Sequence, residues 1–229
     1  MDIVTNLKKI KAEIDASLFR SANPKREVTL IAVTKNRNIE EINQVIQEDH
    51  FVLGENRVQE LRDKYPLLSP KVKWHLIGHL QRNKVKYITD KVTLVHSLEN
   101  YGLAEEINKR MEKLNYPMEC LVQVNPAQEQ TKFGLDVHEV IPFIQQVSQL
   151  PWIKIKGLMT IAPEVENPEE VRPVFKEMFK LFNHIKDNIK ISNVEMKYLS
   201  MGMTNDFQVA IEEGANMVRI GSAIFGPRN

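Results

Sequence analysis

The chain has 229 residues, of which 42% are hydrophobic and 27% charged, with 31 lysines and arginines against 30 acidic residues. This composition is that of an ordinary globular protein with enough apolar material for a sizeable core, so it excludes extensive disorder. The near-neutral charge provides no overall field for nucleic acid, a membrane surface or a polyanion, and we expect none of these as a partner.

The N-terminal segment predicts an amphipathic helix. Ile3, Leu7, Ile10, Ile14 and Leu18 recur at three- and four-residue steps, which gives a helix one buried face. Charged residues interrupt every apolar run of this segment, so neither a signal peptide nor a membrane span fits. The expected location is the cytoplasm.

Short apolar runs alternate with longer amphipathic segments along the rest of the chain. We predict eight strands, at residues 28–33, 51–54, 72–78, 92–97, 118–125, 153–159, 196–202 and 217–223. Helical patterns lie at residues 39–47, 101–114, 137–150 and 168–189. This alternation predicts an α/β fold, a single TIM-like (β/α)8 barrel with an extra N-terminal helix, and one domain over residues 1–229. A doubly wound open sheet is the structural alternative.

Cys120 is the only cysteine and lies in a predicted strand. A single thiol excludes an intramolecular disulfide and a multi-thiolate metal site, and it fits a reducing compartment. We expect Cys120 to be a small core residue and no metal to be bound.

In parallel barrels, reactive groups lie where strands end and the next loops begin, because these ends converge on one mouth. That rule selects one position after each of seven predicted strands: Lys35, Asn56, His79, Asn125, Met159, Ser200 and Gly221.

Lys35 directly follows a strand made of core residues. Desolvation at such a place lowers the pKa of a lysine and exposes a free amine that can form an imine with an aldehyde. A solvated surface charge is the alternative interpretation.

The C-terminal block MVRIGSAIFGPR predicts a phosphate site. Gly221 and Ser222 follow a strand and can present backbone N–H groups and a hydroxyl to an anion, and Ser200 can donate a second hydroxyl. Thr204 is expected to cap the next helix, whose positive end would favour the same anion. Ordinary turn and cap residues are the alternative.

Arg219 lies two residues before Gly221, on the same predicted strand face. A buried arginine needs an acceptor, and a pyridine nitrogen is one such acceptor. Because arginine stays protonated, the ring would be a poor electron sink and carbanion chemistry would be weak. An ion pair with an inward carboxylate is the other possibility.

Together these blocks resemble a known family. IAVTK, GENRVQE, WHLIGHLQRNK, QVN followed by E..TKFG, GLMTI and LSMGMTNDF..AIEEGANMVRIGSAIFG occur in order over residues 28–226. They resemble the YggS/PROSC family of pyridoxal phosphate homeostasis proteins. The last block is the most specific.

The resemblance implies the barrel of the alanine racemase N-terminal domain, the fold type III class of pyridoxal phosphate proteins, without the second β-domain. It implies pyridoxal 5′-phosphate as cofactor, held as an imine on Lys35. By the same comparison, Ser200, Gly221 and Ser222 hold the phosphate, Arg219 faces the pyridine nitrogen and Asn56 lies close to the cofactor. His79 is also expected at the mouth, whereas Lys84 and Lys132 match family lysines without an assigned role.

Two departures from the family pattern leave the ligand selectivity of the mouth open. Lys35 is followed by Asn36, Arg37 and Asn38, where many relatives continue with a Lys-Pro type of sequence. Thr204 stands where serine is usual.

The resemblance favours a carrier that buffers the cofactor and supplies apo-enzymes, with no catalytic residue assigned. An amino-acid racemase is the alternative, but racemisation needs bases on both faces of the carbanion. In two-domain relatives the second base is a tyrosine from the additional domain, for which this chain is too short. A class I aldolase is a third reading, which would need no arginine at position 219. Without the racemase dimer interface we expect a monomer.

Overall fold

The computed structural model describes residues 2–127 and 133–227. Lys132, a lysine of the quoted family blocks, lies outside these residues. Within the described ranges, none of the helices combines the length and the apolar character that crossing a membrane requires.

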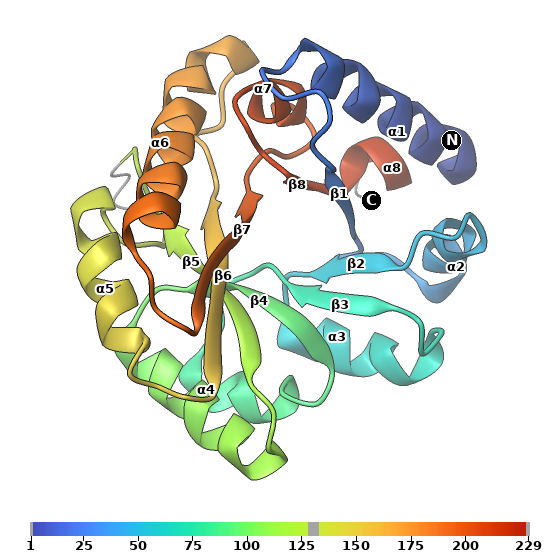
Figure 1. Ribbon diagram of the computed structural model, residues 1–229. Helices are drawn as coiled ribbons and strands as arrows, with labels where there is room; N and C mark the ends of the chain where they lie inside the picture. Colours follow the sequence, from blue (N-terminus) through green and yellow to red (C-terminus); the bar gives the residue numbers. More distant parts are fainter. Residues whose placement is uncertain (1, 128–132, 228–229) are drawn as a thin grey trace.

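Eight parallel strands close into a barrel in sequence order, as Figure 1 shows. The strands are β1 Thr29–Val33, β2 Val52–Glu55, β3 Lys73–Leu76, β4 Val92–Leu98, β5 Met118–Val124, β6 Ile153–Thr160, β7 Val194–Ser200 and β8 Met217–Ile220. The barrel closes where β1 pairs with β8, with Ile31 opposite Arg219. The prediction of a (β/α)8 barrel is therefore confirmed, and the open-sheet alternative is wrong.

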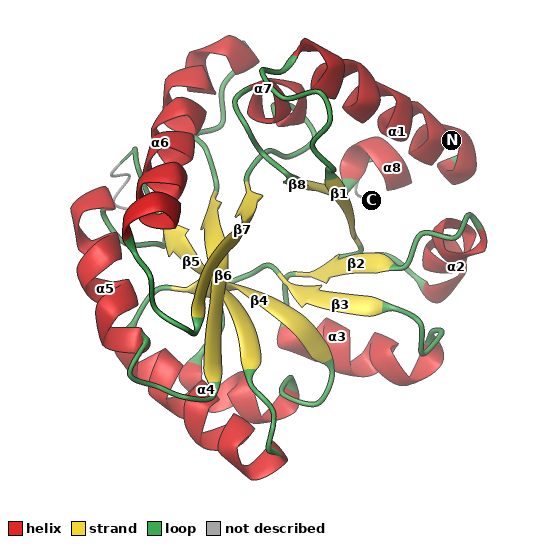
Figure 2. Cartoon of the chain, viewed as in Figure 1, coloured by secondary structure: helices red, strands yellow, loops and turns green. Residues whose placement is uncertain are grey.

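Helices surround the sheet (Figure 2). They are α1 Ile3–Arg20, α2 Ile39–Gln47, α3 Val58–Lys64, α4 Tyr101–Leu114, α5 Val140–Val147, α6 Arg172–Asn188, α7 Phe207–Glu212 and α8 Ser222–Phe225. Short 3-10 segments add η1 Tyr65–Leu67, η2 Arg82–Tyr87, η3 Val137–Glu139 and η4 Pro168–Val171. The predicted helices at 39–47 and 101–114 are confirmed residue for residue, because Asn38 and Asn100 cap their first turns.

Two predicted boundaries near the C-terminus are wrong. The strand predicted at 217–223 ends at Ile220, and Ser222 already begins α8. Thr204 does not cap the following helix, because α7 begins only at Phe207. The Asp206 carboxylate instead accepts a hydrogen bond from the backbone N–H of Met203 and so closes the loop before α7.

Apolar side chains fill two separate regions. The larger core lies between the sheet and the helices and includes the predicted inner face of α1, with Ile3, Leu7, Ile10 and Ile14 buried. A smaller cluster fills the inside of the barrel and consists of Ile31, Leu94, Leu121, Met159 and Met217. Cys120 is fully buried, and burial raises the pKa of its thiol, so the predicted core role is confirmed.

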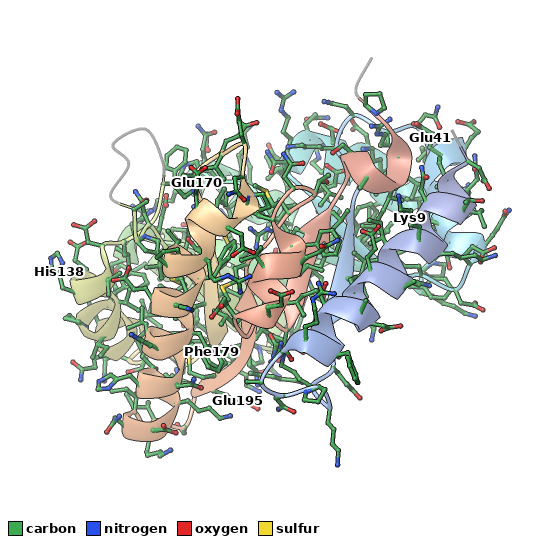
Figure 3. The ribbon with its side chains drawn as sticks, turned by 90° about the horizontal axis from the view of Figure 1, so that it is seen from above. Lys9, Glu41, His138, Glu170, Phe179 and Glu195 are labelled. Atoms are coloured by element: carbon green, nitrogen blue, oxygen red, sulfur yellow. The ribbon has the colours of Figure 1, made fainter. Side chains whose placement is uncertain are left out.

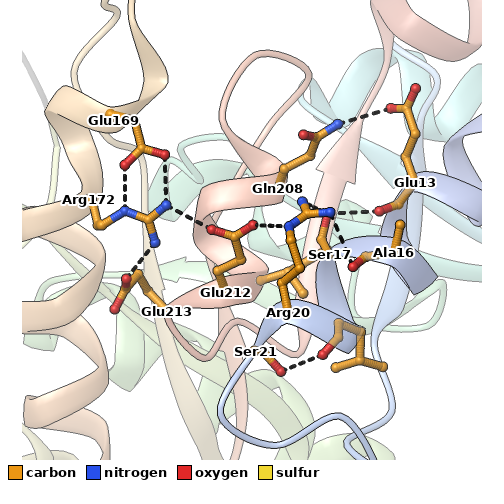
Figure 4. A network of polar contacts seen from close by, with 12 residues as sticks. Glu13, Ala16, Ser17, Arg20, Ser21, Glu169, Arg172, Gln208, Glu212 and Glu213 are labelled. Carbon is orange, nitrogen blue, oxygen red and sulfur yellow. Dashed lines mark hydrogen bonds and ion pairs between the residues drawn. The ribbon is translucent and has the colours of Figure 1, made fainter.

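Charged side chains tie α1, α6 and α7 together on the outside of the barrel (Figure 4). Arg172 forms ion pairs with Glu169, Glu212 and Glu213 at 2.6–2.7 Å. Glu212 is shared with Arg20 of α1, also at 2.7 Å. The network fixes α7 and hence one end of the loop that precedes it.

The segments that follow the strands lie at one end of the barrel, and the starts of the strands lie at the other. Figure 3 places Glu41 and Glu170, which lie in segments that follow β1 and β6, toward one end. Glu195, at the start of β7, lies toward the other. The loops after the strands therefore share one end, where barrel proteins carry their sites.

Candidate functional site

A cavity of about 470 Å³ opens among the loops that follow the strands. Its wall includes Lys35, Asn56, Arg219, Gly221 and Ser222, which are predicted site residues. The remaining wall residues are Val33, Ile77, Ile161, Ala162, Pro163, Glu164, Val165, Pro168, Met203, Thr204, Asn205 and Asp206. The structure thus brings together residues from both ends of the sequence, because β1 and β8 are neighbours.

Lys35 lies in a tight turn that directly follows β1. The turn spans Thr34 to Arg37 and is closed by a hydrogen bond from Arg37 N to Thr34 O of 3.0 Å. Asn36, its third residue, has a φ of 59°, a left-handed conformation that asparagine tolerates better than most residues. Thr34 N continues the sheet by donating to Gly54 O at 3.0 Å. The lysine backbone is therefore anchored to the barrel rather than carried on a long loop.

Asn56 follows β2 and is held by its neighbours. Its backbone N–H donates to Oε2 of Glu55 at 3.2 Å. The backbone of Gly78 packs directly against it, since a Cβ atom at position 78 would lie 2.2 Å from Asn56 O. Only glycine permits this approach, so the loops after β2 and β3 are locked together beside Lys35.

Gly221, Ser222 and Thr204 form a polar corner of the cavity. The hydroxyl of Ser222 donates to Oγ1 of Thr204 at 3.1 Å, and both residues belong to the wall. A Cβ atom on Gly221 would lie 3.3 Å from Cβ and O of Val33, so a larger residue would crowd the end of β1. The corner offers two hydroxyls and a backbone that a ligand can approach closely.

Arg219 is buried, with 4% of its surface exposed, and begins a chain of polar contacts across the barrel interior. Its guanidinium donates to Oγ of Ser200 and to Thr160 O, each at 2.7 Å. Ser200 Oγ lies 3.1 Å from Nδ1 of His96, whose Nε2 lies 3.1 Å from Nδ1 of His75.

The protonation states of the side chains in this series of polar contacts follow from their burial. Burial lowers the pKa of His75 to about 4 and that of His96 well below its usual range, so both rings are neutral at neutral pH. Because Arg219 can only donate, Ser200 Oγ accepts from it, and each neutral imidazole carries one donor and one acceptor nitrogen for the contacts that follow. Burial also lowers the pKa of Arg219 to about 10, against the opposing charge of Asp206. The arginine therefore stays charged, and its acceptors at Oγ of Ser200 and the carbonyl of Thr160 are neutral oxygens.

Several predicted mouth residues lie elsewhere. Ser200 is fully buried and does not belong to the cavity wall, so its assignment to a phosphate stays a prediction while its contacts are with Arg219 and His96. Met159 belongs to the apolar barrel interior. His79 pairs with Glu99 at 2.9 Å and stacks on Phe133, with ring centroids 3.9 Å apart, and it is not one of the wall residues.

Sequence reasoning missed the loop from Met203 to Asp206 and the buried charges behind Lys35. The loop was assigned to a helix start, although Gly202, with a φ of 95°, marks a break in the chain direction. Glu55 gave a usable signal, since an acidic residue at the end of an apolar strand needs a buried cation. The structure supplies that cation from Lys64.

Comparisons with known proteins point in one direction. Residues 6–229 match the family described as alanine racemase, N-terminal domain. A pyridoxal phosphate homeostasis protein of Aquifex aeolicus is 40% identical over 229 residues, covering 100% of this chain and 99% of that protein.

Solved structures agree with this result. A crystal structure of an unknown protein from Bifidobacterium adolescentis has a TM-score of 0.91 at 31% identity, covering 97% of this chain and 94% of that one. PipY of Synechococcus elongatus PCC7942, with pyridoxal phosphate bound, has a TM-score of 0.85 at 29% identity, covering 98% and 100%.

Proposed function

The chain belongs to the pyridoxal phosphate homeostasis protein family, and we propose that it binds pyridoxal 5′-phosphate as an imine on Lys35 and buffers this cofactor in the cell. The observation that carries the proposal is the cavity wall, where a lysine that follows β1 shares one space with Arg219 and the polar corner of β8. The cofactor supplies a reactive aldehyde; the protein supplies the amine and the groups that hold the rest.

The wall residues fit three polar features of the cofactor, its aldehyde, its phosphate and its pyridine nitrogen. Lys35 matches the aldehyde, and the hydroxyls of Ser222 and Thr204 beside Gly221 match a phosphate. Arg219 offers a donor that suits an unprotonated pyridine nitrogen. We assign Ser200 to holding Arg219, because its hydroxyl already accepts from that guanidinium and contacts His96.

A carrier is favoured over an amino-acid racemase. A racemase needs a second base opposite the lysine. The described wall residues include no tyrosine, and Lys35 is the only lysine among them. A guanidinium at the pyridine nitrogen would also keep the ring a poor electron sink, which suits storage better than carbanion chemistry.

The wider biology of the protein follows as part of the same proposal. We propose that the chain acts as a monomeric, single-domain cytoplasmic protein that passes the cofactor to apo-enzymes. The near-neutral composition supports partners other than nucleic acid or membranes.

The first experiment follows the visible spectrum of the purified protein with added pyridoxal 5′-phosphate, then reduces the complex with borohydride and maps the labelled peptide. We expect an imine band and a stable adduct on Lys35. Lys35→Ala should lose the band yet still bind pyridoxine 5′-phosphate, the alcohol analogue, through the corner at Ser222.

Lys84→Ala is the matched control, because this exposed lysine lies in η2 and should keep the full band. An adduct on a lysine other than Lys35, or a band that survives in Lys35→Ala, would refute the assignment.

A further inference from the structure

A cluster of charged side chains lies behind the cavity wall and is not used by the site described so far. Glu55, the last residue of β2, is fully buried, and Lys64, the last residue of α3, keeps 10% of its side chain exposed. Their charged groups meet at 2.7 Å. Buried ions are costly unless their bonds are complete, so the partners of this pair identify its task.

The ammonium of Lys64 has three acceptors for its three protons. It donates to Oε1 of Glu55 at 2.7 Å, to Oε2 of Glu60 at 2.9 Å and to the carbonyl of Thr34 at 2.7 Å. The third acceptor is significant, because Thr34 belongs to neither β2 nor α3. It is the residue before Lys35.

The two carboxylates bind the turn on both sides of Lys35. Oε1 of Glu55 accepts from the hydroxyl of Thr34 at 2.6 Å, and Oε2 of Glu60 accepts from the backbone N–H of Asn36 at 2.7 Å. Asn36 has the left-handed φ of this turn, a conformation that needs support from its surroundings. The residues that flank the lysine are therefore both fixed by one buried cluster.

The same cluster reaches the next residue of the wall. The second oxygen of Glu55 accepts from the backbone N–H of Asn56 at 3.2 Å. A pair that only stabilised the β2–α3 unit would bond within that unit, and an apolar pair would serve that purpose as well. Here Lys64 bonds to Thr34, and Glu55 and Glu60 bond to Thr34 and Asn36, so the bonds leave that unit for the turn that carries Lys35.

We propose that Glu55, Glu60 and Lys64 form a clamp of positioning residues that holds the Lys35 turn in the geometry needed for imine formation. The inference rests on the proposed function. In that step the Lys35 nitrogen bonds to the aldehyde carbon, and the aldehyde oxygen leaves as water with the two amine protons. The clamp touches neither reactant and acts by fixing where the nitrogen starts.

The test compares Glu55→Gln, Lys64→Met and the double variant that combines them. Each single variant removes one member of the buried Glu55–Lys64 pair and leaves the other with fewer of its bonds, so it should be less stable than the native chain. The double variant removes both charges and should recover much of that stability. The measured quantities are the free energy of unfolding in urea, the rate at which the imine band forms with pyridoxal 5′-phosphate, and the affinity for pyridoxine 5′-phosphate.

The clamp predicts that the double variant binds pyridoxine 5′-phosphate normally but forms the imine about tenfold more slowly, because positioning of the attacking atom is lost. A double variant that regains both stability and the native rate would show a merely structural pair and overturn the proposal.

Glu60→Gln covers the case in which the buried variants fail to fold, because Glu60 keeps 21% of its side chain exposed. It weakens the bonds of Glu60 to Asn36 and Lys64 but keeps the buried Glu55–Lys64 pair, so it should slow imine formation with a smaller loss of stability than the buried variants. Glu106→Gln is its matched control, with 15% exposure and an i,i+4 ion pair to Arg110 within α4, outside the turn. Equal rates in these two variants would also overturn the clamp, whereas a native chain that forms no imine on Lys35 would instead refute the proposed function.

Discussion

The hydroxyls of Ser222 and Thr204 face different surroundings from that of Ser200. The first two lie 3.1 Å apart at the cavity wall, where a ligand can replace their mutual hydrogen bond. The third is enclosed between Arg219 and His96. At the scale of single residues, the two hydroxyls at the cavity wall and the hydroxyl that supports Arg219 therefore lie in distinct environments.

Ser222→Ala is expected to weaken binding of pyridoxal 5′-phosphate about tenfold and to leave pyridoxal binding unchanged, since a hydrogen bond to a charged group contributes about 1.5–3 kcal/mol. Isothermal titration with both ligands measures the ratio. Ser200→Ala should keep that ratio but reduce the unfolding free energy by about 1–3 kcal/mol, because Arg219 loses an acceptor. Loss of phosphate discrimination in Ser200→Ala but not in Ser222→Ala would restore the original sequence prediction.

Individual site residues could be predicted from the sequence where the strand-end rule alone decides their place. Lys35, Asn56 and Gly221 follow β1, β2 and β8 and line the cavity. The rule does not state whether a side chain is covered by its neighbours, which is why Ser200 lies behind Arg219 and His79 turns to Glu99. Those outcomes depend on contacts between segments far apart in the sequence.

At the scale of elements, the spacing of hydrophobic residues and the capping residues sufficed to predict the bounds of two long helices. α2 and α4 could be predicted to the residue because asparagine caps precede regular apolar spacing. α3, with seven residues, and α8, with four, are too short to show a period. Both carry parts of the site or of its support, so the least predictable elements are those near the cofactor cavity.

The close approach of the β2 and β3 loops provides a test at this scale. Gly78→Ala should displace Asn56, because the added Cβ would lie 2.2 Å from a backbone oxygen. We expect lower stability and at least about tenfold weaker binding of pyridoxine 5′-phosphate.

Gly102→Ala is the matched control. Gly102 lies in α4, and a Cβ atom added there would meet only side-chain atoms, at 3.7 Å or more. It should be neutral or slightly stabilising in a helix. Native binding by Gly78→Ala would show that the loop relaxes without cost to the site.

The whole molecule should lose stability in weak acid because it buries neutral imidazoles. Burial lowers the pKa of both His50 and His75 from 6.5 to about 4. Between these values the unfolded chain binds more protons than the native one, so the unfolding free energy falls as pH drops from 6.5 to 4. Each group contributes on the order of 3 kcal/mol to that fall.

Urea unfolding at a series of pH values measures this loss. His50→Gln should flatten the profile between pH 6.5 and 4, because glutamine keeps a donor for Val52 O without titrating. His184→Gln, at an exposed position of α6, should leave the profile unchanged. If the unfolding free energy fell equally steeply with pH in the native chain and in His50→Gln, the loss of stability could not be attributed to His50.

Closure of the barrel by β1 and β8 also has a consequence for biosynthesis. Lys35 is translated well before Arg219, Gly221 and Ser222, although β1 and β8 are neighbours in the folded barrel. The groups proposed to surround the cofactor therefore meet only after β8 has been translated. On the proposed assignment, a nascent chain that still lacks β8 cannot form this cavity, and the appearance of the imine colour during translation would report the moment at which β8 docks on β1.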